Sequence, residues 1–528
     1  MRNFQGPGRS AVRSTQGMAA TSHPLSTLAA IDILRAGGNA VDAAICASAV
    51  QTVVEPQSTG IGGDCFVLYC PAGTDVPIAL NGSGRSPAKA TIDWYRDRGM
   101  AAMPIYGPHS VTVPGAIDAW CRLQQDYGKL GLAEVLAPAI YYAENGYVVH
   151  DRVSFDWAAS VSLLAADPHS AEIFLPGGQA PLAGDTHRQP ALARTLQKIA
   201  SEGRDGFYVG SVAEAIVRRL KELGGLHTLE DFSAAAGDYV TPISADYGGF
   251  RVHQVPPNNQ GVTALLMLNI LSGYCLTNLE PHGADRLHLE IEAGRLAFRD
   301  RDFRLGDAES SWEGSTRMLS SRRANCLREG INIGRAMTNL PDPELATSDT
   351  VCIAVVDKDR NAISLINSLS GLFGSGISCL ETGVVLHNRA ASFRLDSSHP
   401  NALAPRKRPL HTLMPGMITR AGRAVMPYGV MGGDYQPFGH AHFLSNVIAY
   451  GMDLQEAIDD ARVFHRDGCV VVEHGVSLDA IHQLRDKGHT VVIADKPLGG
   501  AQAIWIDHER DTLTGASDPR KDGIAAGY

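Results

Sequence analysis

The stretch that decides the fold is residues 348–376, which read SDTVCIAVVDKDRNAISLINSLSGLFGSG. Within it, two apolar runs at 351–356 and 362–369 flank a polar turn at 357–361. Short apolar runs on both sides of such a turn predict a buried β-hairpin. Thr350 stands at the entry to the first strand. Threonine is common at strand entries, so the rest of the chain must decide whether Thr350 is also catalytic.

The elements before the hairpin alternate between helix and strand. Apolar spacing predicts a helix at 26–36 and a second at 40–55, which Asn39 can cap. A glycine turn at 59–64 then leads into a strand at 65–69. The order helix, turn, strand is the reverse of a dinucleotide-binding fingerprint, so we interpret the segment as a tight backbone turn.

The parts of the chain before and after Thr350 differ in composition and in predicted secondary structure. Residues 301–348 are polar and rich in Ser, Asp, Arg and Pro, which predicts an irregular, accessible segment. After Thr350 we expect further strands at 425–433, 470–473 and 490–494. We expect further helices at 454–463 and 478–487. Two layers of strands with helices outside fit this pattern.

Composition limits the class of protein. The chain has 528 residues, 19% of them charged, and a formal net charge of −10 without a long basic block, so we expect no nucleic-acid partner. We find no apolar run of about 18 residues and no apolar signal core, so we expect no membrane partner. Nine scattered cysteines without a Cys-x-x-Cys pair indicate a reducing compartment, and we expect a cytoplasmic enzyme.

Several common catalytic motifs are absent from the sequence. His440 and His442 form a lone His-x-His, without a His-Glu-x-x-His or a cysteine pair, and we interpret them as structural. There is no Gly-x-Ser-x-Gly elbow and no Walker loop. We therefore expect no metal and no cofactor.

A set of motifs spread along the chain carries a family resemblance. Together they resemble the gamma-glutamyltransferase family of N-terminal nucleophile hydrolases. The matching motifs lie at 17–20, 37–44, 60–63, 113–115, 297–301, 355–359, 373–376, 407–410, 432–433 and 516–520, and include His288 and Glu292-Ala293.

The resemblance implies an α+β fold, a four-layer αββα sandwich made as one precursor. It implies that Thr350 attacks the carbonyl of Asp349 and that an acyl shift and hydrolysis then cut the chain. The products would be a large chain of residues 1–349 and a small chain of residues 350–528. By family position, Ser368 orients Thr350, and the amides of Gly432 and Gly433 form the oxyanion hole.

Cleavage would also supply the base that the Thr350 hydroxyl needs. A new α-amino group has a pKa near 8, against about 10.4 for lysine, so much of it is neutral near pH 7.5. It can then accept the hydroxyl proton directly or through a water molecule.

The pocket departs from the gamma-glutamyl pattern. Ser83 stands where the family has the arginine that binds the α-carboxylate, and Arg85 lies two residues further on. Ser392 stands where the family has the aspartate that binds the α-ammonium group of the substrate. The loss of that anion disfavours a glutamyl substrate. The cationic or neutral set that we expect around the substrate is Arg85, Ser370, Arg389, Ser392, His411 and Thr412.

Such a pocket suits a small-molecule amide of an acid without an ammonium group. Among the family's activities the pattern most resembles hydrolysis of oxamate to oxalate and ammonia, in purine-derived nitrogen use. The alternatives are a gamma-glutamyl hydrolase or transferase, an acylase for glutaryl or cephalosporin side chains, and a non-catalytic member of the family. The resemblance also implies that the large and small chains stay together, and two such pairs could form a dimer.

Overall fold

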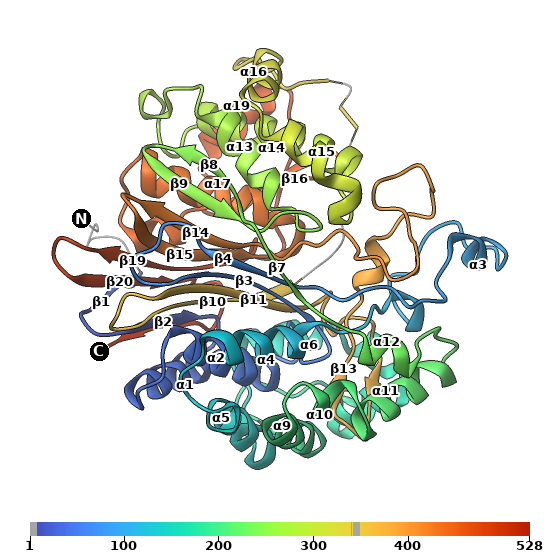
Figure 1. The fold of residues 1–528 in the computed structure, drawn as a ribbon. Helices are drawn as coiled ribbons and strands as arrows, with labels where there is room; N and C mark the ends of the chain where they lie inside the picture. The colour runs from blue at the N-terminus through green and yellow to red at the C-terminus, as the bar shows by residue number, and fades with distance from the viewer. Residues whose placement is uncertain (1–7, 339, 342–348) are drawn as a thin grey trace.

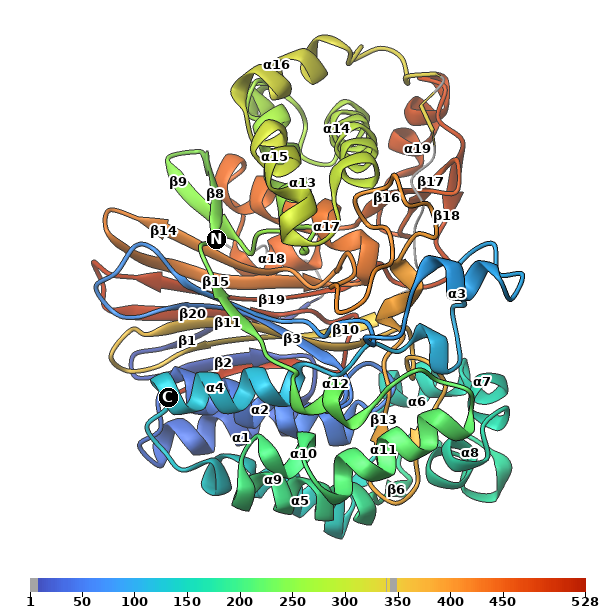
Figure 2. The same cartoon turned by 45° about the vertical axis from the view of Figure 1, so that its right-hand side comes forward.

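The protein is a stack of four layers, with two β-sheets between two layers of helices (Figure 1). This computed structural model describes residues 8–338, 340–341 and 349–528. Within these residues, each of the two central sheets has seven strands. Figure 2 shows the same layers from a second direction, with the sheets running between the helices on both sides. The expected α+β fold, a four-layer αββα sandwich, is confirmed.

The predicted hairpin lies in the middle of one sheet. It consists of β10 (Asp349–Val356) and β11 (Ala362–Ser370), which pair antiparallel. On its two sides lie β2 (Met18–Thr21), which pairs with β10, and β3 (Asp64–Cys70), which pairs with β11. The sheet is completed by β21 (Ile524–Gly527) beyond β2 and by β4 (Ile78–Gly82) and β7 (Asp238–Val240) beyond β3.

The second sheet is centred on β15 (Arg423–Met431). Its strand order is β1-β20-β19-β15-β14-β9-β8. The bounds of the other strands are Val12–Ser14 for β1, Thr512–Ser517 for β20, Gly500–Asp507 for β19, Pro415–Arg420 for β14, Phe250–Gln254 for β9 and Ile243–Tyr247 for β8.

The hairpin is buried on both faces, which explains its continuous apolar runs. In β10, Cys352 and Ala354 face the second sheet, whereas Ile353 and Val355 face the helices. The sheets approach so closely that a side chain at Gly429 of β15 would place its Cβ 2.4 Å from the Cys352 sulfur. Glycine is therefore required at 429 for β10 and β15 to pack in contact.

Alanine-rich helices cover the outer face of the hairpin sheet. The long buried helix α2 (Ala40–Val54) has the expected cap at Asn39, whose side chain accepts from the amides of Val41 and Asp42. The other helices of this side are α1 (Pro24–Arg35), α4 (Ala116–Tyr127), α5 (Leu132–Asn145), α6 (Asp151–Ala158), α7 (Val161–Ala165), α8 (Pro168–Phe174), α9 (Pro190–Glu202), α10 (Asp205–Tyr208), α11 (Ser211–Glu222) and α12 (Leu229–Ser233). The short helix α3 (Ile92–Arg96) lies apart from this layer and packs in a small cluster with Phe393 and Leu403 (Figure 1). Two short strands, β5 (Tyr147–Val148) and β6 (Thr186–His187), pair among them.

The helices over the second sheet come from both halves of the chain. Its core includes α13 (Gly261–Leu271), the long α14 (Ala284–Arg304) and α17 (Gln436–Leu444). The short helix α18 (Leu454–Asp459) packs on the same sheet. Beyond α14 lie α19 (Leu478–Asp486) and a small sheet of β16 (Val463–Arg466), β17 (Cys469–Val472) and β18 (Val491–Ile493). The strands β12 (Ser378–Cys379) and β13 (Val384–Val385) form a separate pair.

The prediction of an irregular segment at 301–348 is wrong for much of its length. α14 continues to Arg304, and two further helices follow, α15 (Ala308–Met318) and α16 (Ser321–Glu329). Both begin at side-chain caps, Asp307 and Ser320, which accept from backbone amides of the first turn. The apolar spacing of the sequence does not predict these two helices, because only a few of their side chains are buried and most are polar. Residues 339 and 342–348 of the segment lie outside the described part of the chain.

In the described part of the chain, no helix combines the length and apolar character needed to span a membrane.

Four buried histidines make the folded state sensitive to acid. Burial lowers the pKa of His187, His227 and His253 to about 4 and that of His440 to about 3. Below pH 6.5 the unfolded chain gains a proton at each site while the folded chain does not, so stability is lost as the pH falls from 6.5 towards 4.

At pH 5.5 each such histidine should lower the free energy of unfolding by about 1.4 kcal/mol relative to pH 7.5. We therefore expect the urea midpoint to fall clearly between these two pH values. His253→Gln should reduce the pH dependence, and the exposed His482 provides the matched control His482→Gln. Equal midpoints at both pH values would contradict the prediction.

Candidate functional site

Thr350 lies at the start of β10, where the hairpin is irregular. Asp349 pairs with Ser370 and Val351 with Asn367, so β11 has one residue more than β10 between these pairs. Such a bulge redirects the side chains beside it. The Thr350 hydroxyl is buried and donates to the Ser368 hydroxyl oxygen at 3.3 Å.

Ser368 connects the nucleophile candidate to the end of β11. Its oxygen also accepts from the amide of Ser370 at 2.8 Å. Ser370 has a φ of 79°, a left-handed conformation that is rare for serine and that turns the chain out of the strand. The structure thus brings Thr350, Ser368 and Ser370 together at one end of the hairpin.

A glycine turn follows β15, the strand that packs across β10 and β11. Gly432 and Gly433 both have positive φ, 116° and 58°. A side chain at 432 would place its Cβ 2.8 Å from the Cα of Gly499, so the turn requires glycine for space as well as for conformation. Consecutive amides in such a turn form a concave donor site that can hold an anionic oxygen.

Arg389 is a buried cation with unused donors. It begins the short helix η4 (Arg389–Ser392), and its side chain is 3% exposed. Its Nη1 donates to Thr412 Oγ1 at 2.8 Å, whereas Nε and Nη2 have no hydrogen-bond partner among the residues that the structure describes. Burial lowers the pKa of Arg389 to about 10, and Asp64 and Asp434 oppose the shift, so the guanidinium is charged at neutral pH.

The position of Arg389 relative to the hairpin is fixed by the preceding residue. The side-chain oxygen of Asn388 accepts from the amide of Gly371 at 2.9 Å, and the Asn388 amide donates to the Leu369 carbonyl at 3.2 Å. Arg389 therefore follows directly on the contact with the end of β11.

His411 faces a buried carboxylate. Its Nε2 donates to Asp64 Oδ2 at 2.9 Å, and its Nδ1 accepts from the Leu413 amide. Burial, with a contribution from Arg389, lowers the pKa of His411 to about 3, so the ring is neutral. Both ring nitrogens are engaged within the protein.

Asp64 supports this part of the site from the hairpin side. It pairs with Ser368 across β3 and β11, and its Oδ1 accepts from the amides of Gly84 and Gly115 at 3.0 and 3.1 Å. Burial would raise its pKa, but His387 and His411 hold the pKa of Asp64 well below its ordinary value. Asp64 is therefore a buried anion.

Ser392 and Thr412 line a hollow at the surface. The hollow encloses about 1120 Å³, including open solvent, and Asp434 also lines it. The Ser392 hydroxyl lies between the carbonyls of Arg389 and Leu410, at 3.1 and 3.0 Å.

Arg85, a predicted site residue, is paired with two aspartates near the surface. Its guanidinium contacts Asp238 at 3.5 Å and Asp307 at 3.9 Å, and it donates to the Arg406 carbonyl. The side chain is 41% exposed and lines a separate, small hollow with Ser83 and Arg406. The structure does not bring Arg85 to Arg389 or to the end of β11.

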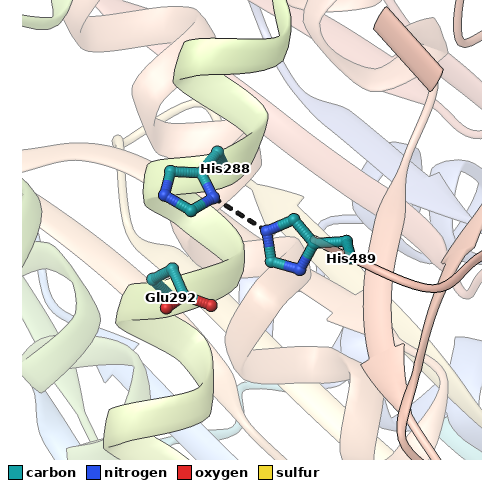
Figure 3. Close-up of side chains that lie close together, drawn as sticks. All are labelled: His288, Glu292 and His489. Carbon is teal, nitrogen blue, oxygen red and sulfur yellow. Dashed lines mark hydrogen bonds between the residues drawn. The ribbon is translucent and has the colours of Figure 1, made fainter. Parts of the chain in front are cut away.

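One cluster has the composition of a metal site. His288 and Glu292 lie one turn apart on α14 and point towards His489 (Figure 3), with candidate ligand atoms within 4.8 Å of one another. Each of these atoms already has a protein partner: the two rings share a hydrogen bond of 2.7 Å, His288 Nε2 contacts the Asn332 carbonyl, and Glu292 binds Arg295 and the Met337 amide. The three side chains are thus joined into one hydrogen-bond network with Asn332, Arg295 and Met337.

Asp64, Gln260 and Arg301 are parts of this region that the sequence argument missed. Asp64 had a usable signal, since it is a carboxylate between a glycine turn and a fully apolar strand. Gln260 lies in a loop and Arg301 near the end of a helix, and their contacts with the site join segments far apart in the sequence.

Comparison with known proteins gives consistent matches over the whole chain. A family model described as gamma-glutamyltranspeptidase matches residues 26–528. The chain is 40% identical over 527 residues to the glutathione hydrolase-like YwrD proenzyme of Bacillus subtilis, covering 98% of this chain and 99% of that protein. It is 36% identical over 530 residues to the oxamate amidohydrolase proenzyme of Klebsiella pneumoniae, with coverage of 98% and 99%.

A solved structure is also similar to this protein over the whole chain. The cephalosporin acylase from Bacillus halodurans matches with a TM-score of 0.94 and 38% sequence identity, covering 100% of this chain and 99% of that chain.

Replacing Asp64 tests how much its buried negative charge contributes to the stability of the folded protein. We expect Asp64→Asn to lower the free energy of unfolding by about 3 kcal/mol, because it removes the anion to which His411 and two backbone amides donate. Urea unfolding at pH 7.5 measures the change. The matched control is Glu381→Gln in the exposed Arg218–Glu381 pair, which should have no measurable effect. Equal midpoints for both variants would contradict the assignment.

Proposed function

Since the chain belongs to the gamma-glutamyltranspeptidase family, also called gamma-glutamyltransferases, whose members act on amide C–N bonds, we propose that it is a self-cleaving amidohydrolase. Thr350 is the proposed nucleophile and the amide of a small acid, oxamate in the first place, is the proposed substrate. The proenzymes among its relatives support the self-cleavage.

The proposed maturation uses the irregular start of β10. Thr350 Oγ1 attacks the Asp349 carbonyl carbon, the peptide C–N bond breaks, and the Thr350 nitrogen leaves as an amine. Water then hydrolyses the resulting ester to the Asp349 carboxylate and the free Thr350 hydroxyl. The bulge at Thr350 and the hydrogen bond to Ser368 support this step, because both fix the hydroxyl next to the bond that is cut.

The proposed turnover uses the new amino group as the base. It accepts the hydroxyl proton while Thr350 Oγ1 attacks the substrate carbonyl, and the proton then leaves with the amine product. The amides of Gly432 and Gly433 would hold the negative oxygen of the tetrahedral intermediate. Water hydrolyses the acyl-enzyme, which for oxamate gives oxalate and ammonia.

The observation that carries the choice of substrate is the free edge of Arg389. Among the described residues Thr412 binds Nη1 and none binds Nε or Nη2, the two donors along one edge of the planar guanidinium. This edge matches a carboxylate in a two-point contact, and charge-assisted pairs of this kind are strong. An acid amide with its carboxylate beside the scissile carbonyl fits such a donor pair.

The rest of the pocket supports an acid without an ammonium group. Ser392 stands at the position expected for the ammonium-binding aspartate, and its hydroxyl faces two backbone carbonyls. His411 is neutral and donates to Asp64, which leaves Arg389 as the buried cation next to Thr412.

An acylase for larger side chains is the second candidate. The similarity to a cephalosporin acylase favours it, and so does the wide hollow beside Ser392 and Thr412, which would admit a bulky acyl group. A substrate panel decides between the candidates.

The assembly and location are proposed together with the activity. Residues 1–349 and 350–528 would remain associated as large and small chains. We propose a cytoplasmic location, which the nine free cysteines support because such usage is typical of a reducing compartment.

Loss of the nucleophile should abolish maturation. Thr350→Ala should remain a single chain and release no ammonia, because neither the attack on Asp349 nor the acyl-enzyme can form. Intact mass spectrometry of the purified protein measures this. Thr350→Ser, which retains a hydroxyl, is the matched control and should still be cut. A small chain that begins at a residue other than Thr350 would rule out the mechanism.

Arg389 should determine the preference of the enzyme for amides that carry a carboxylate over neutral amides. We expect Arg389→Gln to lower kcat/KM for oxamate by about 10- to 100-fold, the value of a lost charge-assisted contact, and Arg389→Lys to lose less. For simple neutral amides the change should be small. Ammonia release over oxamate, glutamine, glutathione and neutral amides measures both.

Two outcomes would overturn the substrate proposal. One is faster cleavage of a gamma-glutamyl anilide or a cephalosporin side chain than of oxamate by the wild-type protein. The other is an equal loss on charged and neutral amides in Arg389→Gln, which would assign Arg389 a structural role.

A further inference from the structure

The proposed oxyanion turn is held by a side chain from a distant part of the sequence. Gln260 lies just before α13 and is buried. Its Nε2 donates to the Gly433 carbonyl at 3.1 Å and to the Thr412 carbonyl at 3.1 Å. One side chain thus connects the glycine turn to the residue that orients Arg389.

Arg301 fixes which way the Gln260 amide points. Arg301 Nη1 donates to Gln260 Oε1 at 2.9 Å, and arginine has no acceptor. The oxygen of the amide must therefore face Arg301, and the nitrogen must face the two carbonyls. Arg301 also contacts Asp434, the residue after the turn, and Asp302.

Arg301 is itself held rigidly. Its side chain is 2% exposed and its guanidinium lies 4.3 Å from the centre of the Phe298 ring. Burial opposes the charge, but Asp302 and Asp434 raise the pKa of Arg301 above its ordinary value. The guanidinium is therefore a permanent cation at the back of the turn.

We propose that Gln260 and Arg301 are positioning residues that set the direction of the Gly432 and Gly433 amides and couple this turn to Arg389 through Thr412. The inference rests on the proposed function, since it concerns the same site. Glycine peptides rotate easily, so two consecutive amides aim at one point only if their carbonyls and neighbours are held. Gln260 holds the Gly433 carbonyl, in the peptide that leaves the turn, and the Tyr435 amide donates to the Gly432 carbonyl, in the peptide that carries the Gly433 N–H. Arg301 holds both Gln260 and Asp434, so the turn is anchored where it leaves Gly433.

Gln260→Glu is the sharpest test. It preserves the size of the side chain and the acceptor for Arg301, and it removes the donor to Gly433 and Thr412. We expect kcat to fall about 10- to 100-fold, as for a displaced catalytic group, with KM changed less than about threefold. Arg301→Lys, which retains the charge, should recover part of the activity that Arg301→Met loses.

Inhibitor binding separates positioning from general damage. A boronic acid that forms a tetrahedral adduct with Thr350 should bind Gln260→Glu at least about tenfold more weakly, since its oxygen occupies the oxyanion site. Oxalate, which binds through Arg389 and has no tetrahedral oxygen, should lose less affinity than the boronate. The matched control is Gln455→Glu, a buried glutamine that donates to the Ser517 carbonyl at 2.9 Å, and it should retain kcat and boronate affinity.

The outcomes distinguish this inference from the proposed function. A wild-type protein that remains uncut and hydrolyses none of the amides overturns both. A wild-type protein that is active, with a Gln260→Glu variant of unchanged kcat and boronate affinity, overturns the positioning role alone. Equal losses in Gln260→Glu and Gln455→Glu would also reject it.

Discussion

The close packing of β15 on the β10–β11 hairpin is the constraint on which the site depends. Gly429 allows β15 to approach Cys352 of β10, so the two sheets are held at a fixed separation. The ends of these strands then carry the chemical groups, Thr350 at the start of β10 and the glycine turn after β15. A wider separation would move the proposed nucleophile, Thr350, away from the amides that are proposed to stabilise its product.

Charges in this region are arranged around the same strand ends. Asp64 is an anion that accepts hydrogen bonds from His411 and from two backbone amides, and Arg301 is a cation that is paired with Asp302 and Asp434. Arg389 differs, because the described residues leave two of its donors unused. A buried charge without a full set of partners is costly, and a ligand that completes the set gains that energy on binding.

The sequence was informative where one short segment determines a structure. The hairpin, the capped helix α2 and the β3 strand follow from local apolar patterns, because burial on both faces or one face imposes those patterns. The four-layer fold and the family came from motifs rather than from periodicity. The helices α15 and α16 were missed since their mostly polar surfaces give little periodic signal.

For the site, the sequence could name residue types but not distances. Thr350, Ser368, Arg389 and Thr412 lie in one region, as the motif order suggested, whereas Arg85 is paired with Asp238 and Asp307 in another. Arg85 and Arg389 look alike in the sequence, and only their partners in space separate them. Gln260 had no signal of its own, because its importance comes from two carbonyls more than 150 positions away.

The strand order has a consequence for how the mature protein could be assembled. In the hairpin sheet, β10 and β11 lie between β2 and β3, which belong to the part of the chain before Thr350. In the second sheet, strands from after Thr350 likewise lie between β1 on one side and β9 on the other. A cut at Thr350 would leave two polypeptides that each contribute strands to both sheets. Neither polypeptide could form either sheet alone. Folding would therefore come before such a cut, and two separately made halves would have to fold on each other rather than dock.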